Sequence, residues 1–141
     1  MIVWMRHGES EWNVSGRLQG HAAHPALTDR GRAQVEAAVD ELRPLGISRV
    51  LSSPLVRAQQ SAEIVARALE LPWSVDDRLI EMGLDEDPTH VVARLEPLLA
   101  EDRDGTVLMV SHGDTIPIAH HLLTGENLPG PLGNATVVTT P

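Results

Sequence analysis

Five side chains that can carry chemistry lie just beyond short apolar segments of this sequence: Arg6, His7, Arg57, Glu81 and His112. Two arginines together bind phosphate well, because each guanidinium fork matches a pair of phosphate oxygens. A neutral imidazole can accept a phosphoryl group, and a second imidazole can donate to the oxygens on which transition-state charge develops. A carboxylic acid can protonate the leaving alkoxide and then deprotonate the attacking water. Brought together by the fold, these side chains predict phosphoryl transfer that needs no metal ion.

The segments around these residues alternate between strand and helix patterns. Short apolar runs predict strands, and apolar residues at helical spacing predict helices. Thr28, and Ser53 followed by Pro54, mark helix starts, and Gly125 marks a helix end. Such alternation predicts an α/β fold, with a mostly parallel sheet covered by helices on both faces. The expected strands are 2–5, 49–52, 73–75, 106–110 and 134–139, and the expected helices are 28–45, 53–69, 88–102 and 115–123.

A sheet of this kind would place the candidate residues at one edge, because ligands bind at the carboxyl ends of the strands in open α/β sheets. Four strand ends are expected to bring both histidines, Glu81 and two or three arginines to one rim, with Arg78 as the third arginine. Arg57 stands in the first turn of a helix, where a cation is unfavourable. We therefore favour an anion-binding role for Arg57 over its structural alternative, a salt bridge to Glu63 or Asp29.

Composition excludes several other classes of protein. The chain has 141 residues and a net charge of -9, with no cysteine, phenylalanine or tyrosine. Without cysteine it has no disulfide or thiolate metal site, and its apolar runs are far shorter than the roughly 20 residues that span a membrane. An acidic chain with few aromatic residues lacks the footprint of a nucleic-acid-binding protein. No signal-peptide pattern precedes Arg6, so we expect one cytoplasmic domain over residues 1–141, with neither nucleic acid nor membrane as partner.

Longer motifs surround the candidate residues. The chain resembles the histidine phosphatase superfamily, the phosphoglycerate mutase-like clan, first in the stretch Arg6-His7-Gly8-Glu9-Ser10-Glu11-Trp12-Asn13. A lone Arg-His-Gly is a weak signal, but further blocks follow in the family's order and relative spacing across nearly the whole chain. The resemblance implies a three-layer α/β/α sandwich, with a mostly parallel central sheet and one antiparallel edge strand. The further blocks are residues 16–20, 27–34, 52–58, 61–63, 79–81, 110–113 and 134–137.

The resemblance also implies a role for each candidate residue. It makes His7 the nucleophile that becomes phosphohistidine, and Glu81 the proton donor, and it implies no cofactor and no metal. As purely structural residues, Glu81 would be solvated or paired with Arg78, and Asn13 would belong to a turn. The implied phosphate pocket consists of Arg6, His7, Asn13, Arg57 and His112.

Two departures from the family pattern bear on the activity. Residues 21–26 replace a stretch in which many members carry an Asp, so we expect a different loop there. His112 follows Glu81 by only 31 positions, whereas most members insert a longer segment that caps the pocket. A mutase must shield its phosphorylated intermediate from water, which favours a closed lid. The short segment therefore favours hydrolysis of a small phosphorylated metabolite over phosphoryl transfer between substrates.

Three other functions stay open beside this hydrolase: a phosphohistidine-protein phosphatase, a phosphoglycerate-type mutase and a non-catalytic binder of phosphorylated ligands. The remaining histidines raise the question of a metal site, through His21 with His24 and through the adjacent pair His120 and His121. Adjacent side chains on a helix point in different directions, and no carboxylates cluster beside these histidines. We therefore expect no metal site.

Overall fold

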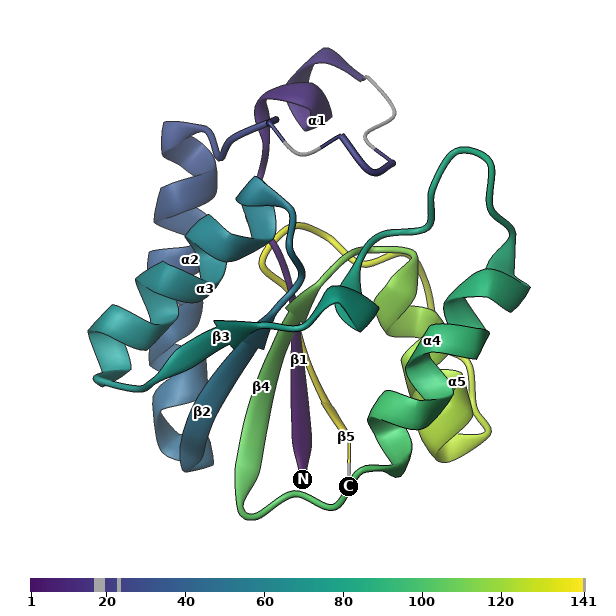
Figure 1. Cartoon of the computed structure of the whole chain (residues 1–141). Coiled ribbons are helices and arrows are strands. Elements are labelled where there is room, and N and C mark those ends of the chain that lie inside the picture. Colours follow the sequence, from purple (N-terminus) through teal and green to yellow (C-terminus); the bar gives the residue numbers. More distant parts are fainter. Residues whose placement is uncertain (17–19, 23, 141) are drawn as a thin grey trace.

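The centre of the structure is a five-stranded sheet (Figure 1). This computed structural model describes residues 1–16, 20–22 and 24–140. Neighbouring strands are parallel, except that the last strand runs antiparallel to the first at one edge. The expected sheet is therefore confirmed. Its strands are β1 (Ile2–Arg6), β2 (Ile47–Ser52), β3 (Trp73–Val75), β4 (Thr106–Ser111) and β5 (Val137–Thr140), in the order β3-β2-β4-β1-β5.

Helices cover both faces of this sheet (Figure 1). Successive residues of a strand point to opposite faces. Val3 and Met5 therefore pack with the helices on one face, while Ile2 and Trp4 pack with the helices on the other. Two apolar layers result, which confirms the three-layer α/β/α sandwich. The first face carries α2 (Asp29–Leu42) and α3 (Val56–Leu69), and the second carries α4 (Pro88–Ala100) and α5 (Thr115–Thr124).

A short helix, α1 (Glu11–Ser15), follows β1 where the sequence predicts only a loop. Its first turn is closed by a reciprocal pair of bonds, because Ser10 Oγ accepts from the backbone of Asn13 and the Asn13 side chain accepts from the backbone of Ser10. The Ser-x-x-Asn spacing is the signal that indicates such a start. Two single-turn 3-10 helices complete the chain, η1 (Arg43–Leu45) and η2 (Asp77–Leu79).

Several predicted boundaries differ from the structure by one to three residues, and the two starts that differ by three residues both lie at the carboxyl edge of the sheet. Helix α3 begins at Val56 instead of Ser53, because Oγ of Ser53 lies 2.7 Å from Nε2 of His112 and does not cap the helix. Strand β5 begins at Val137 instead of residue 134, because Ala135 has a φ of 56° and donates its N–H to the carbonyl of His7. In both segments a contact with a histidine thus replaces the regular structure that the sequence predicts.

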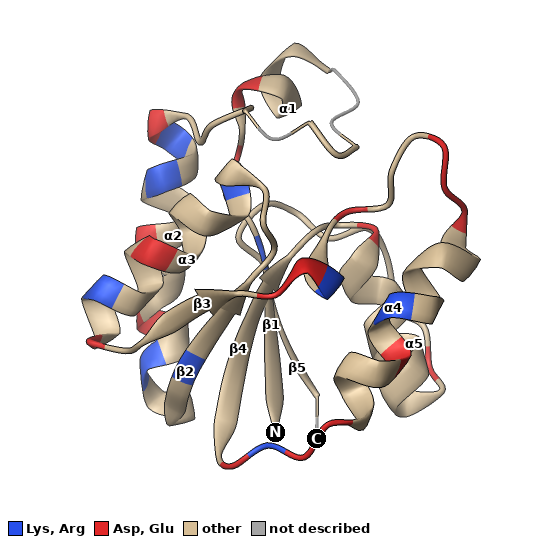
Figure 2. Cartoon of the chain, in the orientation of Figure 1, with Lys and Arg blue, Asp and Glu red and all other residues tan. Residues whose placement is uncertain are grey.

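Charge is unevenly distributed over the chain. Acidic side chains gather on the loops that flank α4, at residues 85–87 and 101–104 (Figure 2). Among the described residues, no helix is long and apolar enough to cross a membrane.

Candidate active site

The carboxyl ends of β1 and β4 bring the two predicted histidines together. Arg6 and Ser111 are paired in the register of these parallel strands, and His7 and His112 directly follow them. The imidazole centroids are 5.3 Å apart with the ring planes at 60°, and both side chains are fully buried. The structure thus places the two histidines side by side.

His7 is held with one ring nitrogen available for chemistry. Its Nδ1 lies 2.7 Å from the carbonyl oxygen of Gly8. A carbonyl only accepts, so Nδ1 carries the hydrogen and the lone pair is on Nε2. That Nε2 is buried and has no hydrogen-bond partner among the described residues. Burial, followed by the neighbouring His112, holds the pKa of His7 well below 6.5, so the imidazole is neutral and nucleophilic at neutral pH.

Arg57 reaches the site from the first turn of α3, with its side chain fully buried. Its NH2 lies 3.1 Å from Oε1 of Glu81 and also donates to the carbonyl of Gly20 at 3.0 Å, while NH1 donates to the carbonyl of Ala22 at 2.8 Å. We call residues 20–22 the strap. The anticipated structural partner Glu63 instead pairs with Arg67 on the outside of α3. The guanidinium is therefore fixed in the site by one carboxylate and two carbonyl groups.

Glu81 lies between the phosphate-binding candidates. Its Oε1 is 3.1 Å from NH2 of Arg57 and 3.2 Å from Nδ1 of His112, and the side chain is 15% exposed. Arg78, the proposed third arginine, is wrong as a site residue, because its guanidinium binds Asp76 and Glu101 at 2.8 and 2.7 Å. The ion pairs with Asp76 and Glu101 thus hold Arg78 away from the histidines, whereas Glu81 faces them.

Arg6 lies at the end of β1, where its NH1 donates to the carbonyl of Leu132 at 2.6 Å. A Cβ on Gly113 would lie 3.0 Å from Nε of Arg6, so glycine at this position leaves room for the guanidinium. Asp114 follows, and burial, together with the charge of Glu81, raises its pKa above 3.8. The site therefore combines two arginines, Arg6 and Arg57, with two carboxyl groups, those of Glu81 and Asp114.

Asn13 is joined to the site by a network of hydrogen bonds. Its Oδ1 accepts from the backbone N–H and the hydroxyl of Ser10, at 3.0 and 3.2 Å, and from Nδ2 of Asn134 at 3.2 Å. Asn134 also donates to the carbonyl of His7 at 3.4 Å. Asn13 thus ties α1 to the segment before β5, and its contact with a phosphate stays a prediction.

Two buried serines contact the site and carry no role in the sequence-based prediction. Ser61 Oγ accepts from the N–H of Gly8 at 3.1 Å and donates to the carbonyl of Arg57 at 2.8 Å, so it joins the loop of His7 to α3. Ser53 Oγ contacts His112. A hydroxyl on the apolar face of a helix signals such a contact, because buried polar groups need partners.

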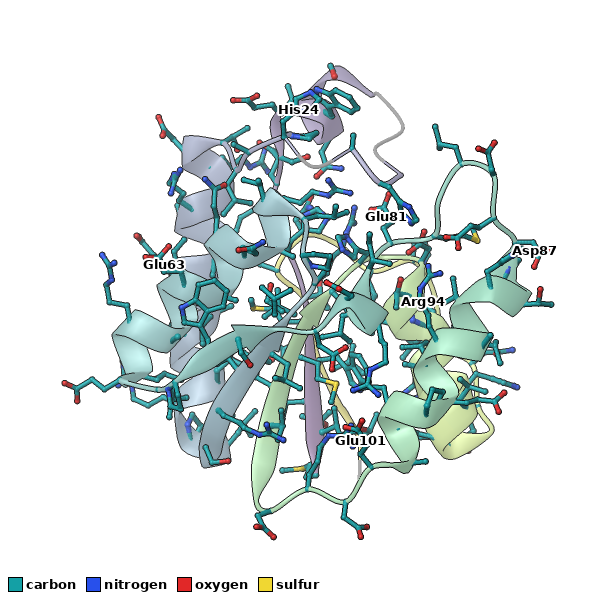
Figure 3. The ribbon with its side chains drawn as sticks, in the orientation of Figure 1. His24, Glu63, Glu81, Asp87, Arg94 and Glu101 are labelled. Atoms are coloured by element: carbon teal, nitrogen blue, oxygen red, sulfur yellow. The ribbon has the colours of Figure 1, made fainter. Side chains whose placement is uncertain are left out.

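A hollow of about 490 Å³ opens beside Glu81. Nε2 of His21, in the strap, lies 2.6 Å from the carbonyl oxygen of Glu81. Figure 3 shows Glu81 at this edge of the sheet and Arg94 on α4, where Arg94 binds Glu86 at 2.8 Å and holds the pKa of that carboxyl at about 2. The hollow is lined by Trp12, His21, Ala22, Gly83, Leu84, Asp85 and Glu86.

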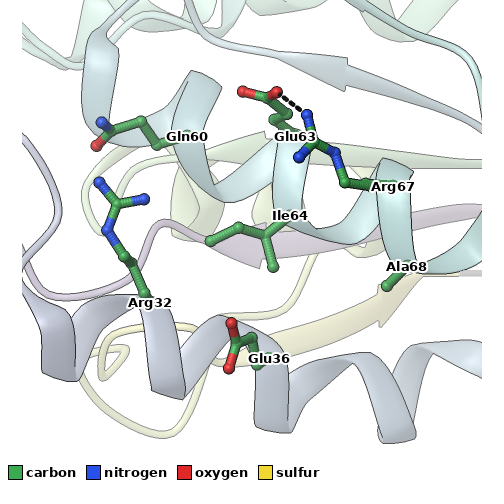
Figure 4. Close-up of a pocket in the computed structure, with 7 residues that line it drawn as sticks. All are labelled: Arg32, Glu36, Gln60, Glu63, Ile64, Arg67 and Ala68. Carbon is green, nitrogen blue, oxygen red and sulfur yellow. Dashed lines mark hydrogen bonds and ion pairs between the residues drawn. The ribbon is translucent and has the colours of Figure 1, made fainter.

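A second hollow, of about 530 Å³, lies between α2 and α3 (Figure 4). Two of its four charged residues, Arg67 and Glu63, pair with each other at 2.8 Å. None of the candidate phosphate-binding or catalytic residues lines it, so we assign it no part in phosphoryl transfer.

Three of the site residues could also offer ligand atoms to a metal ion. Within the described residues, one atom each from His7, Glu81 and His112 lies within 4.8 Å of the others. Arg6 and Arg57 act electrostatically on both imidazoles, and they would repel a divalent cation strongly at such short range. The arrangement suits a phosphate better, and operation without a metal stays a prediction.

Comparison with known proteins gives relatives of two kinds. The probable phosphoglycerate mutase GpmB of Proteus mirabilis is 40% identical over 83 residues, which are 59% of this chain and 38% of that protein. The chain therefore matches about two fifths of the length of this curated relative. A solved mycobacterial glucosyl-3-phosphoglycerate phosphatase has a TM-score of 0.84 at 26% identity, over 96% of this chain and 88% of its own. A putative alpha-ribazole-5'-P phosphatase from Escherichia coli has a TM-score of 0.79 at 25% identity, over 88% and 79% of the two chains.

A family model also matches this chain. The model described as histidine phosphatase superfamily (branch 1) matches residues 2–94, which include His7, Arg57 and Glu81. The fold and the site geometry agree with that match. The chain therefore belongs to the histidine phosphatase superfamily, branch 1.

Proposed function

We propose that this protein hydrolyses phosphomonoesters through a phosphohistidine formed at Nε2 of His7. The observation that carries the proposal is this nitrogen, which is buried, has no hydrogen-bond partner in the part of the chain that the structure describes, and keeps its lone pair because Nδ1 holds the hydrogen. Arg6 and Arg57 supply the positive charge that a phosphoryl group needs. The proposed substrate is a small phosphorylated metabolite, whose organic part would enter the hollow beside Glu81.

The proposed reaction has two steps. In the first step Nε2 of His7 attacks phosphorus, the ester P–O bond breaks, and the leaving alkoxide takes a proton from Glu81. In the second step Glu81 removes a proton from water, the resulting hydroxide attacks phosphorus, and the P–N bond breaks to release phosphate. A substrate phosphate on Arg57 would displace the contact of 3.1 Å to Glu81.

The segment between Glu81 and His112 supports hydrolysis over transfer. It consists of a loop, α4 and a second loop. Helix α4 packs against the sheet, where Leu95 and Leu98 are fully buried. This segment therefore has no further element with which to enclose the site. Without a capping element from this segment, water can reach an intermediate more easily, which favours its hydrolysis.

The test measures hydrolysis of 4-nitrophenyl phosphate in the presence of EDTA. We expect the wild-type protein to turn over, the His7→Ala variant to lose at least about a thousandfold in kcat/KM, and His121→Ala, at an exposed position of α5, to match wild type. Acid-labile, alkali-stable phosphate on His7 after rapid quenching would identify the intermediate. Equal rates for wild type and His7→Ala would rule the mechanism out.

Mutase activity is the second candidate, because the curated relative at 40% identity is called a probable phosphoglycerate mutase. Adding 3-phosphoglycerate, with and without its bisphosphate, separates the two activities. A mutase forms 2-phosphoglycerate, whereas the proposed hydrolase releases inorganic phosphate from the substrates it accepts.

A further inference from the structure

The hydroxyl of Ser53 faces the second histidine of the site. Ser53 follows β2, and its Oγ lies 2.7 Å from Nε2 of His112. Both side chains are fully buried. The N–H of Leu55 donates to the same Oγ at 3.4 Å. That bond uses an oxygen lone pair, so the hydroxyl hydrogen remains free to point at Nε2.

The alternative orientation, with Nε2–H donating to Ser53, is unfavourable on two counts. First, His112 is the sole acceptor within reach of the Ser53 hydroxyl among the described residues, so the O–H would be buried without an acceptor, which costs about 1–3 kcal/mol. Second, the lone pair of Nδ1 would then face Oε1 of Glu81 at 3.2 Å. The hydroxyl of Ser53 therefore donates to Nε2.

A neutral imidazole has a single N–H, so accepting at Nε2 places the hydrogen of His112 on Nδ1. The ring is neutral, because burial, followed by the charges of Arg57 and Arg6, holds the pKa of His112 well below 6.5. Its Nδ1–H then lies 3.2 Å from Oε1 of Glu81 but makes no hydrogen bond to a described residue, so it is available to a phosphoryl oxygen. His7 uses its Nδ1–H outside the reaction, on Gly8, and keeps Nε2 free.

We propose that Ser53 is a positioning residue, which fixes His112 in the Nδ1–H form so that an uncharged imidazole donates to the transferred phosphoryl group. The proposal rests on the proposed function, because it assigns the donor for that reaction. In this role Ser53 acts through His112 and not on the substrate.

The test compares Ser53→Ala, Ser53→Thr and a matched control, Thr140→Val. Thr140 is also fully buried and donates its hydroxyl to a carbonyl, that of Ile2 at 2.9 Å, near the start of β1. Nitrogen-15 NMR of the imidazole rings in the folded protein reads the tautomer of His112 without any turnover. Kinetics with 4-nitrophenyl phosphate read kcat and KM separately.

We expect the Nδ1–H form of His112 in wild type and in Thr140→Val, and a mixture with the Nε2–H form in Ser53→Ala. In Ser53→Ala kcat should fall about tenfold with KM changed less, since loss of a direct donor costs about a hundredfold or more, and Ser53→Thr should restore the tautomer and kcat. An Nε2–H form in wild type, or an unchanged tautomer and kcat in Ser53→Ala, would overturn the role of Ser53. Wild-type protein that shows the Nδ1–H form but hydrolyses nothing would instead overturn the proposed function.

Discussion

Arg57 and Glu81 form an ion pair in the site, with NH2 of the buried arginine 3.1 Å from Oε1 of the glutamate. The same guanidinium donates to the strap carbonyls of Gly20 and Ala22. A phosphate that binds NH2 of Arg57 must therefore replace the carboxylate of Glu81 and the carbonyl oxygen of Gly20. This exchange couples substrate binding to the release of the Glu81 side chain and to the position of the strap.

Arg57→Lys should remove most of the activity although it keeps the charge. A lysine ammonium cannot present two parallel N–H groups to a phosphate. We expect kcat/KM for 4-nitrophenyl phosphate to fall by about a hundredfold. The matched control is Arg67→Lys on the same helix, whose exposed pair with Glu63 should contribute little. A value of kcat/KM within threefold of wild type in Arg57→Lys would contradict the phosphate role of the fork.

Glu81→Gln should act most strongly on substrates with poor leaving groups. An alkoxide needs the proton of Glu81, whereas nitrophenolate leaves without one. We expect kcat/KM, which reports the first chemical step, to fall by about a hundredfold or more for an alkyl phosphate and less than tenfold for 4-nitrophenyl phosphate. Glu101→Gln, at an exposed carboxylate paired with Arg78, serves as control. An equal loss on both substrates would assign Glu81 another role.

Much of the site could be predicted from the sequence, because strand ends are readable and parallel strands share an edge. The apolar runs ending before Arg6 and Ser111 place two histidines at neighbouring positions once β1 and β4 pair in register. Arg57 follows from the same logic, because its helix begins just beyond β2. The sheet therefore determines which side chains meet.

The contacts that the sequence could not predict are those that depend on the course of the loops. The contacts from Arg57 to Gly20 and Ala22 cross 37 and 35 positions of chain and depend on where the strap turns. Arg78 has a sequence position as favourable as that of Glu81, yet two local carboxylates hold it outside the site. Such choices between nearby partners are decided by a few hydrogen bonds, which leave no periodic pattern in the sequence.

His21→Ala should loosen the strap. The variant loses the contact of 2.6 Å between Nε2 of His21 and the carbonyl oxygen of Glu81. One hydrogen bond of about 1 kcal/mol corresponds to about a fivefold change in an opening equilibrium. Diethyl pyrocarbonate modifies accessible histidines and can therefore report this opening. Side chains of lysine, cysteine and tyrosine would compete for the reagent, but the chain contains none of them. We expect carbethoxylation of His7, followed by peptide mass spectrometry, to accelerate about fivefold.

Phosphate should slow this reaction in both proteins, since it would cover His7. His121→Ala, on the exposed side of α5, should leave the rate at His7 unchanged. Identical rates in His21→Ala and wild type would show that the strap does not limit access to the nucleophile.

Stability should fall on mild acidification because both site histidines are buried as neutral rings. The pKa values of His7 and His112 lie well below 6.5 in the folded protein, so between those values and about 6.5 the unfolded chain binds more protons. Stability is then fully present above pH 6.5 and is lost as the pH falls. Between pH 7.5 and 5.5 we expect about 1.4 kcal/mol less unfolding free energy per histidine. Urea unfolding at the two pH values measures it.

The variant His7→Gln should show about half of this pH dependence, because one of the two neutral rings is gone. Asp114 acts in the opposite sense at lower pH, since its pKa is raised above 3.8. Unfolding free energies that agree at pH 7.5 and 5.5 would mean that the two rings are not held neutral.

Gly31→Ala should destabilise the protein although alanine normally favours a helix over glycine by about 1 kcal/mol. Gly31 lies in the first turn of α2, where an added Cβ would come 2.1 Å from the carbonyl oxygen of Glu9. The neighbouring loop makes a reciprocal approach, because a Cβ on Gly8 would lie 2.4 Å from the carbonyl oxygen of Gly31. We expect urea unfolding to show a loss of about 2–3 kcal/mol, and kcat to fall because the backbone that carries His7 must shift. Gly130→Ala, which meets nothing within 4 Å, should stay within about 0.5 kcal/mol of wild type, and a Gly31→Ala variant as stable as wild type would show that the two backbones do not need this close approach.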